Sequence, residues 1–184
     1  VATGPLARDK RDSITTPEEL FAALDLGPAD LDGACAAAGT FSLRVTRSFL
    51  ARMRRGDRDD PLLRQILPRR EELLDAADYV PDPLHEAAAV RAPNLLQKYA
   101  GRALLVATEA CGIHCRYCFR REFPYSSQPG RWQAALAEIA GDPSLEEIIL
   151  SGGDPLSLSD ARLTQITDAL AGIAHVRRLR VHTR

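Results

Sequence analysis

Three cysteines, Cys111, Cys115 and Cys118, stand close together just after the apolar run 103–107. Their C-x3-C-x2-C spacing puts three thiols on one short loop, with Tyr117 directly before the last of them. Iron–sulfur clusters prefer thiolate ligands and usually have four. A set of three could hold a [4Fe–4S] cluster and leave the fourth iron open, and catalytic metal sites keep such an open position. The spacing therefore predicts a catalytic cluster rather than a structural one.

Two other interpretations of these cysteines stay open. With His114, they could form a Cys3His zinc site, although zinc motifs usually add a second ligand pair further along and none follows here. Structural disulfides are less favoured, because the sequence shows no secretory signal and a reducing compartment is expected. Cys35, within the small-residue stretch 34–38, is expected to be a buried helix residue.

The composition is that of a soluble globular protein. The 184 residues include 24 Lys and Arg against 25 Asp and Glu, a formal net charge of −1, which gives no argument for nucleic-acid binding. No stretch approaches the roughly 20 apolar residues that a membrane span needs. We expect a cytoplasmic protein that binds neither nucleic acid nor membrane.

The N-terminal part has the pattern of short helices. Residues 1–15 are expected to be flexible and 16–80 to form a helical unit. Thr16 followed by Pro17 and two glutamates is typical of a helix start. Further helices are expected at 31–38, 48–55 and 61–67. An arginine-rich stretch, 44–58, is read as a solvated helix face, with a docking surface for an acidic partner as the alternative.

The C-terminal part alternates strands and helices. Residues 81–97 are expected to be a linker. Strands are then expected at 103–108, 147–150 and 179–183, and helices at 132–140 and 159–171, an order that predicts βαβ units with a parallel sheet. Function in parallel barrels lies on the loops after the strands. The cysteine loop and the Ser151-Gly152-Gly153-Asp154 loop both follow strands, so we expect them on one edge.

Three strands cannot close a barrel, and the chain stops at Arg184, in or just after the third. An unpaired strand edge is a liability for a soluble protein. We therefore expect a truncated portion of a longer enzyme, or an edge that another chain covers.

Four groups of residues, in this order, resemble one family. They are Lys98-Tyr99 with Arg102; the cysteine loop continuing Cys118-Phe-Arg120-Arg121; Ser151-Gly-Gly-Asp154-Pro-Leu156; and Arg180-Val-His182-Thr-Arg184. Together they resemble the lysine 2,3-aminomutase family of radical S-adenosylmethionine (SAM) enzymes, in particular the branch that makes (R)-β-lysine for elongation factor P modification. The expected fold is α/β, a helical N-terminal unit followed by the first βα units, 98–184, of a partial TIM-type barrel.

The resemblance also implies cofactors and site residues. Cys111, Cys115 and Cys118 would bind the [4Fe–4S] cluster. Tyr117, Ser151, Gly152, Gly153 and Asp154 would contact SAM, although a Gly-Gly-Asp sequence is also a common turn and Tyr117 could be a buried packing residue. Arg120 would bind the carboxylate of lysine, or else neutralise the cluster.

Pyridoxal 5′-phosphate (PLP) is the third implied cofactor. Lys98 and Tyr99 would contact its phosphate, with a solvated pair as the alternative. The lysine that carries PLP is expected beyond Arg184, because Lys10 and Lys98 are the only lysines. An electron donor such as flavodoxin or ferredoxin is also implied. Another radical SAM enzyme and a zinc-stabilised binding module remain the alternatives.

Overall fold

The computed structural model describes residues 12–75, 77, 79–125 and 132–184. Most of the expected flexible N-terminus, 1–11, lies outside these residues. The chain divides into two compact units. One comprises Thr3–Val80 with Gly112–Arg121, as far as they are described, and the other comprises Pro81–Cys111 with Glu122–Arg184. The division falls within the cysteine loop, directly after Cys111.

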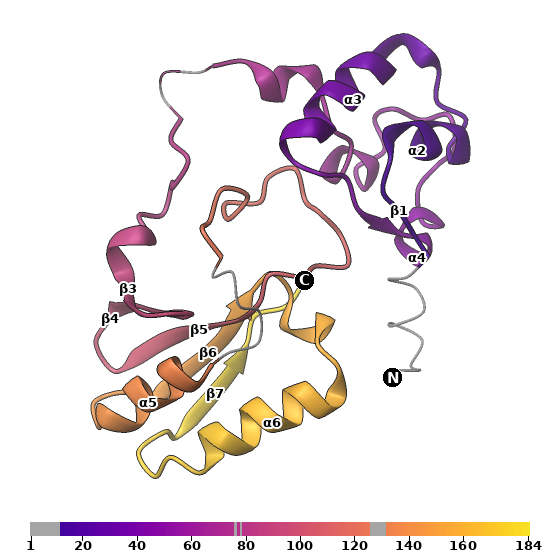
Figure 1. Ribbon diagram of the computed structural model, residues 1–184. Helices are drawn as coiled ribbons and strands as arrows, with labels where there is room; N and C mark the ends of the chain where they lie inside the picture. The colour runs from indigo at the N-terminus through magenta and orange to yellow at the C-terminus, as the bar shows by residue number, and fades with distance from the viewer. Residues whose placement is uncertain (1–11, 76, 78, 126–131) are drawn as a thin grey trace. The chain divides into compact units, whose positions relative to one another are not determined.

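The first unit consists mainly of short helices (Figure 1). Its elements are β1 (Ser13–Ile14), α2 (Pro17–Ala23), η1 (Pro28–Asp30), α3 (Leu31–Thr40), β2 (Val45–Thr46), α4 (Arg47–Leu50), η2 (Leu63–Gln65) and η3 (Arg70–Leu73), where η denotes a 3-10 helix. The start of α2 is as predicted, because the Thr16 hydroxyl accepts a hydrogen bond from the Glu19 amide (3.3 Å) and Pro17 stands in the first turn.

Two of the expected helices are much shorter than their sequence pattern suggested. Only α4 forms in 48–55 and only η2 in 61–67. The buried carboxylate of Asp60 accepts hydrogen bonds from the amides of Arg54, Leu62 and Leu63 at 2.8–3.1 Å. Such side-chain bonds are typical of helix caps and turns, and in this way Asp60 ties the ends of the two shortened segments together.

The core of the first unit gathers apolar residues from β1, α2, α3, β2 and η2 and from the segments between them. Its buried members are Ile14, Leu20, Phe21, Leu24, Ala34, Leu43, Val45, Met53, Leu63, Ile66 and Leu67. Ile113, from the cysteine loop, packs against this core. The segment after Cys111 is therefore part of the hydrophobic packing of the helical unit.

The second unit is an α/β unit built on a five-stranded sheet with the order β3-β4-β5-β6-β7. Its elements are η4 (Ala87–Ala89), β3 (Val90–Ala92), β4 (Leu95–Tyr99), β5 (Arg102–Thr108), α5 (Gln133–Gly141), β6 (Glu147–Gly152), η5 (Pro155–Ser157), α6 (Asp160–Ala171) and β7 (Arg178–Val181). Strands β5, β6 and β7 are parallel, as the sequence predicted, whereas β3 and β4 pair antiparallel. The sheet is therefore mixed, and the expected linker 81–97 contains η4, β3 and part of β4.

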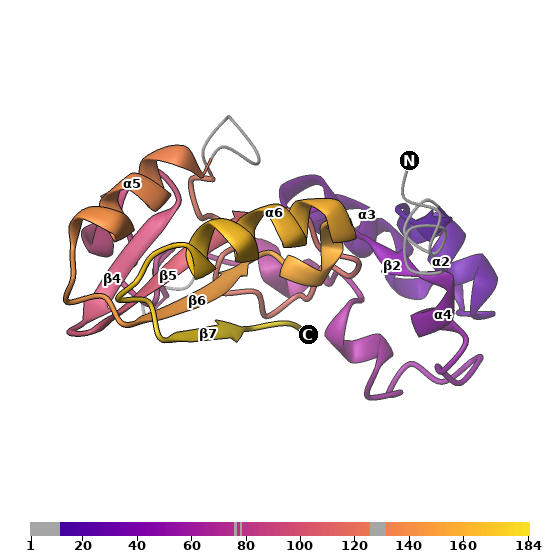
Figure 2. The same ribbon diagram turned by 90° about the horizontal axis from the view of Figure 1, so that it is seen from below.

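Helices α5 and α6 cover one face of this sheet (Figures 1 and 2). Strand residues alternate between the two faces, and those that point toward the helices, such as Leu105, Ile148 and Leu150, are fully buried. They pack with Ile139 of α5 and Ile166 of α6. The helices thus fix β5 and β6 side by side, which sets the positions of the loops that follow them.

Among the described residues, no helix has the length and apolar composition that a membrane span requires.

Candidate functional site

The loops after β5 and β6 meet at the C-terminal edge of the parallel strands, as the sequence predicted. The Gly153 amide donates to the Thr108 carbonyl (2.7 Å), and the Asp154 amide donates to the Ala110 carbonyl (2.8 Å). Cys111 directly follows Ala110. Main-chain hydrogen bonds therefore fix the Gly-Gly-Asp loop against the chain that leads into the first cysteine.

Both glycines of this loop are required by the close approach of backbone. Gly152 has φ +121°, and a Cβ atom there would lie 2.3 Å from the Thr108 carbonyl oxygen. A Cβ on Gly153 would lie 2.5 Å from the Ala110 oxygen. Real Cβ atoms do not approach so closely, so the packing of this edge explains the glycines without a ligand.

Asp154 has local partners as well. Its Oδ1 atom accepts hydrogen bonds from the Leu156 amide (3.0 Å) and the Thr183 hydroxyl (2.6 Å). The first bond caps η5 and the second ties the residues after β7 to the same edge. The carboxylate that the sequence assigned to SAM thus also organises the loop.

Arg184 lies close enough to Cys111 for the two to interact electrostatically. Partial burial lowers the pKa of the Arg184 guanidinium, and the Cys111 side chain opposes this shift. The guanidinium therefore lies at the same edge as the first cysteine.

Cys115 and Cys118 belong to the helical unit, where they form a tight turn. The Cys118 amide donates to the Cys115 carbonyl (3.0 Å), an i to i+3 bond that brings the two residues close. Main-chain bonds hold this segment on the helical unit: the His114 amide donates to the Arg44 carbonyl (2.9 Å), and the Arg116 amide donates to the Gln65 carbonyl (2.8 Å).

His114 makes its contacts within the helical unit. Its Nδ1 atom lies 2.9 Å from the Ser42 carbonyl oxygen, and its ring stacks on Phe41 with the ring centroids 5.5 Å apart. Burial lowers the pKa of His114, and the charges of Arg44 and Arg116 lower it further, against the effect of the Ser42 bond. One ring nitrogen is thus already engaged with protein.

Tyr117 and Arg120 differ sharply in exposure. Tyr117 is 65% exposed, and its hydroxyl lies 3.3 Å from Gln65 Oε1, so it does not act as a buried packing residue. Arg120 is only 4% exposed, and its guanidinium lies over the Phe119 ring, 4.8 Å from the ring centroid. The arginine predicted to bind a carboxylate is therefore largely shielded from solvent.

The donor chemistry of the three cysteines fits an iron–sulfur cluster. All three are free thiols, and each is partly exposed. Within the described residues, no group of three or more His, Cys, Asp or Glu side chains is arranged as a metal site. Cys111 belongs to one unit and Cys115 and Cys118 to the other, so the cluster stays a prediction from the number and spacing of the thiols.

Lys98 and Tyr99 are not brought together with the loops at Cys111 and Gly153. They end β4, and Tyr99 pairs with Arg102 at the start of β5. The seven residues of β5 span roughly 20 Å, so this pair lies at the opposite end of the strand. Lys98 Nζ donates to the Leu84 carbonyl.

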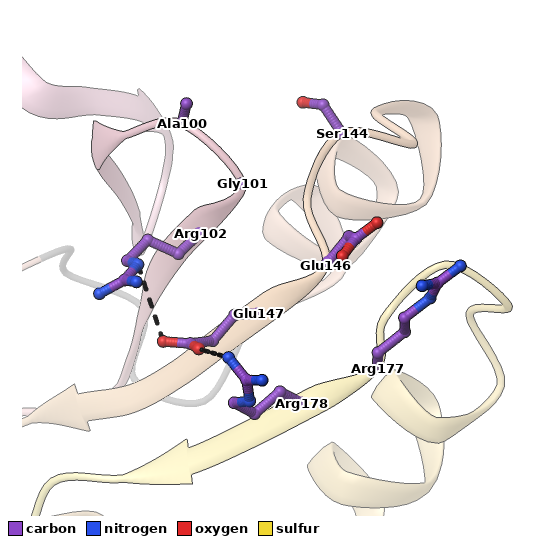
Figure 3. Close-up of a pocket in the computed structure, with 8 residues that line it drawn as sticks. All are labelled: Ala100, Gly101, Arg102, Ser144, Glu146, Glu147, Arg177 and Arg178. Atoms are coloured by element: carbon purple, nitrogen blue, oxygen red, sulfur yellow. Dashed lines mark hydrogen bonds and ion pairs between the residues drawn. The ribbon is translucent and has the colours of Figure 1, made fainter.

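A shallow hollow at this opposite end contains a cluster of charges (Figure 3). Glu147, at the start of β6, lies between Arg102 and Arg178, with N–O distances of 3.8 and 2.7 Å, and Arg180 lies 3.3 Å away. None of the site residues predicted from the sequence lines this hollow.

The sequence reasoning missed two residues that hold the cysteine loop. Glu72 forms ion pairs with Arg116 and Arg121, and the Phe41 ring lies beneath both guanidiniums. Glu72 precedes Arg116 by 44 residues, and no local pattern signals a contact over that separation.

A strand followed by three cysteines, with a Gly-Gly-Asp loop bound beside it in an α/β unit, is the arrangement expected of the radical SAM class. No protein-family model matches the chain. It is 45% identical over 177 residues to the L-lysine 2,3-aminomutase of Escherichia coli, covering 94% of this chain and 52% of that protein. It is also 42% identical to the Haemophilus influenzae protein of the same name, covering 95% and 52%, and 33% identical to that of Clostridium subterminale, covering 95% and 43%.

These similarities confirm that the chain resembles the lysine 2,3-aminomutase family, as its sequence indicated. It spans about half the length of these relatives.

Proposed function

We propose that this chain is part of a radical SAM isomerase, a lysine 2,3-aminomutase that converts (S)-α-lysine to (R)-β-lysine for the modification of elongation factor P. The observation that carries the proposal is the three-cysteine loop in a chain 42–45% identical to relatives named L-lysine 2,3-aminomutase. The first βα units of a TIM-type barrel would form the part that binds the cluster and SAM.

In this proposal Cys111, Cys115 and Cys118 hold the [4Fe–4S] cluster. A cluster with three thiolate ligands leaves one iron for SAM and supplies the electron that cleaves it. The Ser151–Asp154 loop offers main-chain groups and a carboxylate at the edge where Cys111 lies, and the exposed ring of Tyr117 is accessible for stacking on adenine. Arg120 supplies a guanidinium for the carboxylate of lysine.

PLP enters the proposal through family resemblance alone. Lys98 donates to the Leu84 carbonyl and lies with Tyr99 at the far end of β5 from Cys111, and their contact with the PLP phosphate stays a prediction. A flavodoxin or ferredoxin as electron donor likewise follows from the resemblance, and a location in the cytoplasm stays a prediction.

The decisive experiment is anaerobic reconstitution with iron and sulfide, followed by electron paramagnetic resonance of the reduced protein with and without SAM. We expect a [4Fe–4S] signal that shifts when SAM is added, because SAM would occupy the open iron. A protein that binds zinc in place of a cluster would contradict the proposal. The full-length protein should then form β-lysine from lysine.

Two cysteine variants test the assignment within one protein. Cys115→Ala should abolish the cluster signal. Cys35→Ala should leave it unchanged, because Cys35 lies in α3 with its Sγ atom 3.3 Å from Glu18 Oε1. Burial first, and then the nearby Glu18, raises the pKa of the Cys35 thiol, which disfavours the thiolate that iron needs. Cys35 is part-exposed rather than buried as expected. A normal cluster in Cys115→Ala would contradict the ligand assignment.

A further inference from the structure

We propose that Glu72 is a positioning residue for the cysteine loop: by holding Arg116 and Arg121, it fixes the turn that carries Cys115 and Cys118. This inference rests on the proposed function only in naming the cluster as what those thiols bind. All of its contacts lie within the helical unit.

The Glu72 carboxylate binds the loop at two points, one between the two cysteines and one after them. Its Oε1 atom accepts from Arg116 Nε at 3.0 Å, and its Oε2 atom accepts from Arg116 Nη2 at 2.6 Å. Oε2 also accepts from Arg121 Nη1 at 3.3 Å. Arg116 directly follows Cys115, and Arg121 comes three residues after Cys118. One carboxylate therefore holds the loop both within the turn and after its C-terminal end.

These ion pairs are shielded from solvent. The Arg116 side chain is 7% exposed, that of Glu72 is 15% and that of Arg121 is 23%. Partial burial by itself would raise the pKa of Glu72. The hydrogen bonds and charge of Arg116, the hydrogen bond from the Arg69 amide and the charge of Arg121 outweigh it, and the pKa lies below its ordinary value. A bidentate guanidinium–carboxylate pair in this setting is stronger and geometrically more specific than an exposed pair.

The Phe41 ring supports the same two guanidiniums. The Arg116 and Arg121 Cζ atoms lie 4.8 and 4.9 Å from its centroid, and Arg116 Nη1 donates to the Phe41 carbonyl at 2.8 Å. Arg116 thus has a carboxylate, a ring and a carbonyl as partners, which leaves it little freedom to change its orientation. The Glu72 carboxylate and the Phe41 ring, which both belong to the helical unit, also hold Arg121.

A turn held in this way has already lost part of the conformational freedom that it would otherwise lose on binding a cluster. Fixing the backbone of a residue costs conformational entropy, and here the helical unit has already fixed it. When residues outside the ligand set orient the ligands, the loss of such a residue typically weakens metal binding about 10- to 100-fold. We therefore assign the helical unit the role of preorganising two of the three thiols.

The test compares Glu72→Gln with Glu71→Gln. Both remove one negative charge from η3, but Glu71 is exposed whereas Glu72 pairs with Arg116 and Arg121. In the protein without a cluster, we expect Glu72→Gln to raise the alkylation rates of Cys115 and Cys118 by iodoacetamide about 3- to 10-fold. Alkylation of Cys35 should be unchanged, and Glu71→Gln should match the wild type at all sites. Mass spectrometry of peptides measures each rate.

The reconstituted protein gives the second readout. We expect Glu72→Gln to lose iron to a chelator about 10-fold faster than the wild type and Glu71→Gln, and to broaden the signal of the reduced cluster. If the wild type binds no cluster, the proposed function fails while the alkylation rates still test the role of Glu72.

Wild-type alkylation rates in a folded Glu72→Gln protein would overturn the inference, as would faster alkylation with unchanged iron retention and signal. If Glu72→Gln does not fold, as judged by circular dichroism, Arg121→Gln provides the milder test. It removes the 3.3 Å contact to Glu72 and the stacking on Phe41 but keeps the closer pair of Glu72 with Arg116. A smaller increase at Cys118 is the expected result, and no increase overturns the inference.

Discussion

The two ends of the parallel strands β5, β6 and β7 are held together in different ways. At the N-terminal end, charged side chains add to main-chain bonds such as that from the Arg177 amide to the Glu146 carbonyl. Glu147 lies between Arg102 and Arg178, with which it is in register on the two neighbouring strands. At the C-terminal end, main-chain hydrogen bonds from Gly153 and Asp154 link the loops that follow β5 and β6.

This difference matters for function because main-chain bonds do not depend on pH or salt. Exposed charges are screened by salt, whereas an amide–carbonyl bond between closely packed loops keeps its geometry. In parallel α/β barrels the C-terminal face carries the chemistry and the N-terminal face contributes stability. At the end with Cys111, main-chain bonds and closely packed glycines fix the loops without an ion-pair cluster like that of Glu147, as a site needing exact placement would require.

The largest effect should come from a side chain placed at Gly152. Gly152→Ala adds a Cβ that would lie 2.3 Å from the Thr108 carbonyl oxygen, at a φ of +121° that L-residues rarely adopt. Overpacking and backbone strain each cost about 1–3 kcal/mol, so we expect unfolding in urea to show a loss of roughly 3 kcal/mol or more. Gly141→Ala, at the end of α5 with open space around it, should be neutral or slightly stabilising. Equal stability of the two variants would show that the C-terminal end is not fixed by backbone packing.

Elements with strong local signals could be predicted from the sequence. Helix α6 runs from the Ser159 cap to Gly172 as expected, because the Ser159 hydroxyl accepts from the Arg162 amide (3.4 Å). Strand β6 was also found, since its apolar residues form a short continuous run. The strands β3 and β4 were missed because they are short, pair with bulges and show no regular alternation. Asn94, at φ +66° between them, is the one local sign of their hairpin.

The candidate site was predictable only where its residues are close in sequence. The spacing of the cysteines identifies their loop, and the Gly-Gly-Asp sequence identifies the loop beside it. The partners that hold Arg116, which are Phe41 and Glu72, come from distant parts of the chain. Such contacts depend on tertiary packing, which a single sequence does not reveal.

Removing the charge at the N-terminal end should have a smaller effect that depends on pH. The pKa of Glu147 lies below its ordinary value of 4.5 because Arg178 donates a hydrogen bond to it; burial opposes this shift, and the charges of Arg180 and Arg102 support it. A carboxylate whose pKa is depressed by folding stabilises the folded state above about pH 4.5. This stabilisation is lost as the pH falls through the pKa of the carboxylate in the folded state. Glu147→Gln should therefore lower the urea midpoint at pH 7.

The difference between the wild type and Glu147→Gln should shrink below about pH 4.5 and at high salt. Glu146→Gln, at the neighbouring exposed residue, is the matched control and should show neither trend. A difference that is independent of pH and salt would mean that the N-terminal end is held by packing instead of charge.

The smallest effect should follow from removing a side-chain bond at the C-terminal end. Thr183→Val deletes the hydroxyl that donates to Asp154 Oδ1 (2.6 Å), while Thr183→Ser keeps it. Because Thr183 is exposed and the Asp154 amide still binds the Ala110 carbonyl, we expect a loss of only about 0.5 kcal/mol in urea unfolding. A loss of unfolding free energy as large as that of Gly152→Ala would show that side-chain bonds stabilise this end as much as backbone packing does. The contrast between the two ends of the sheet would then disappear.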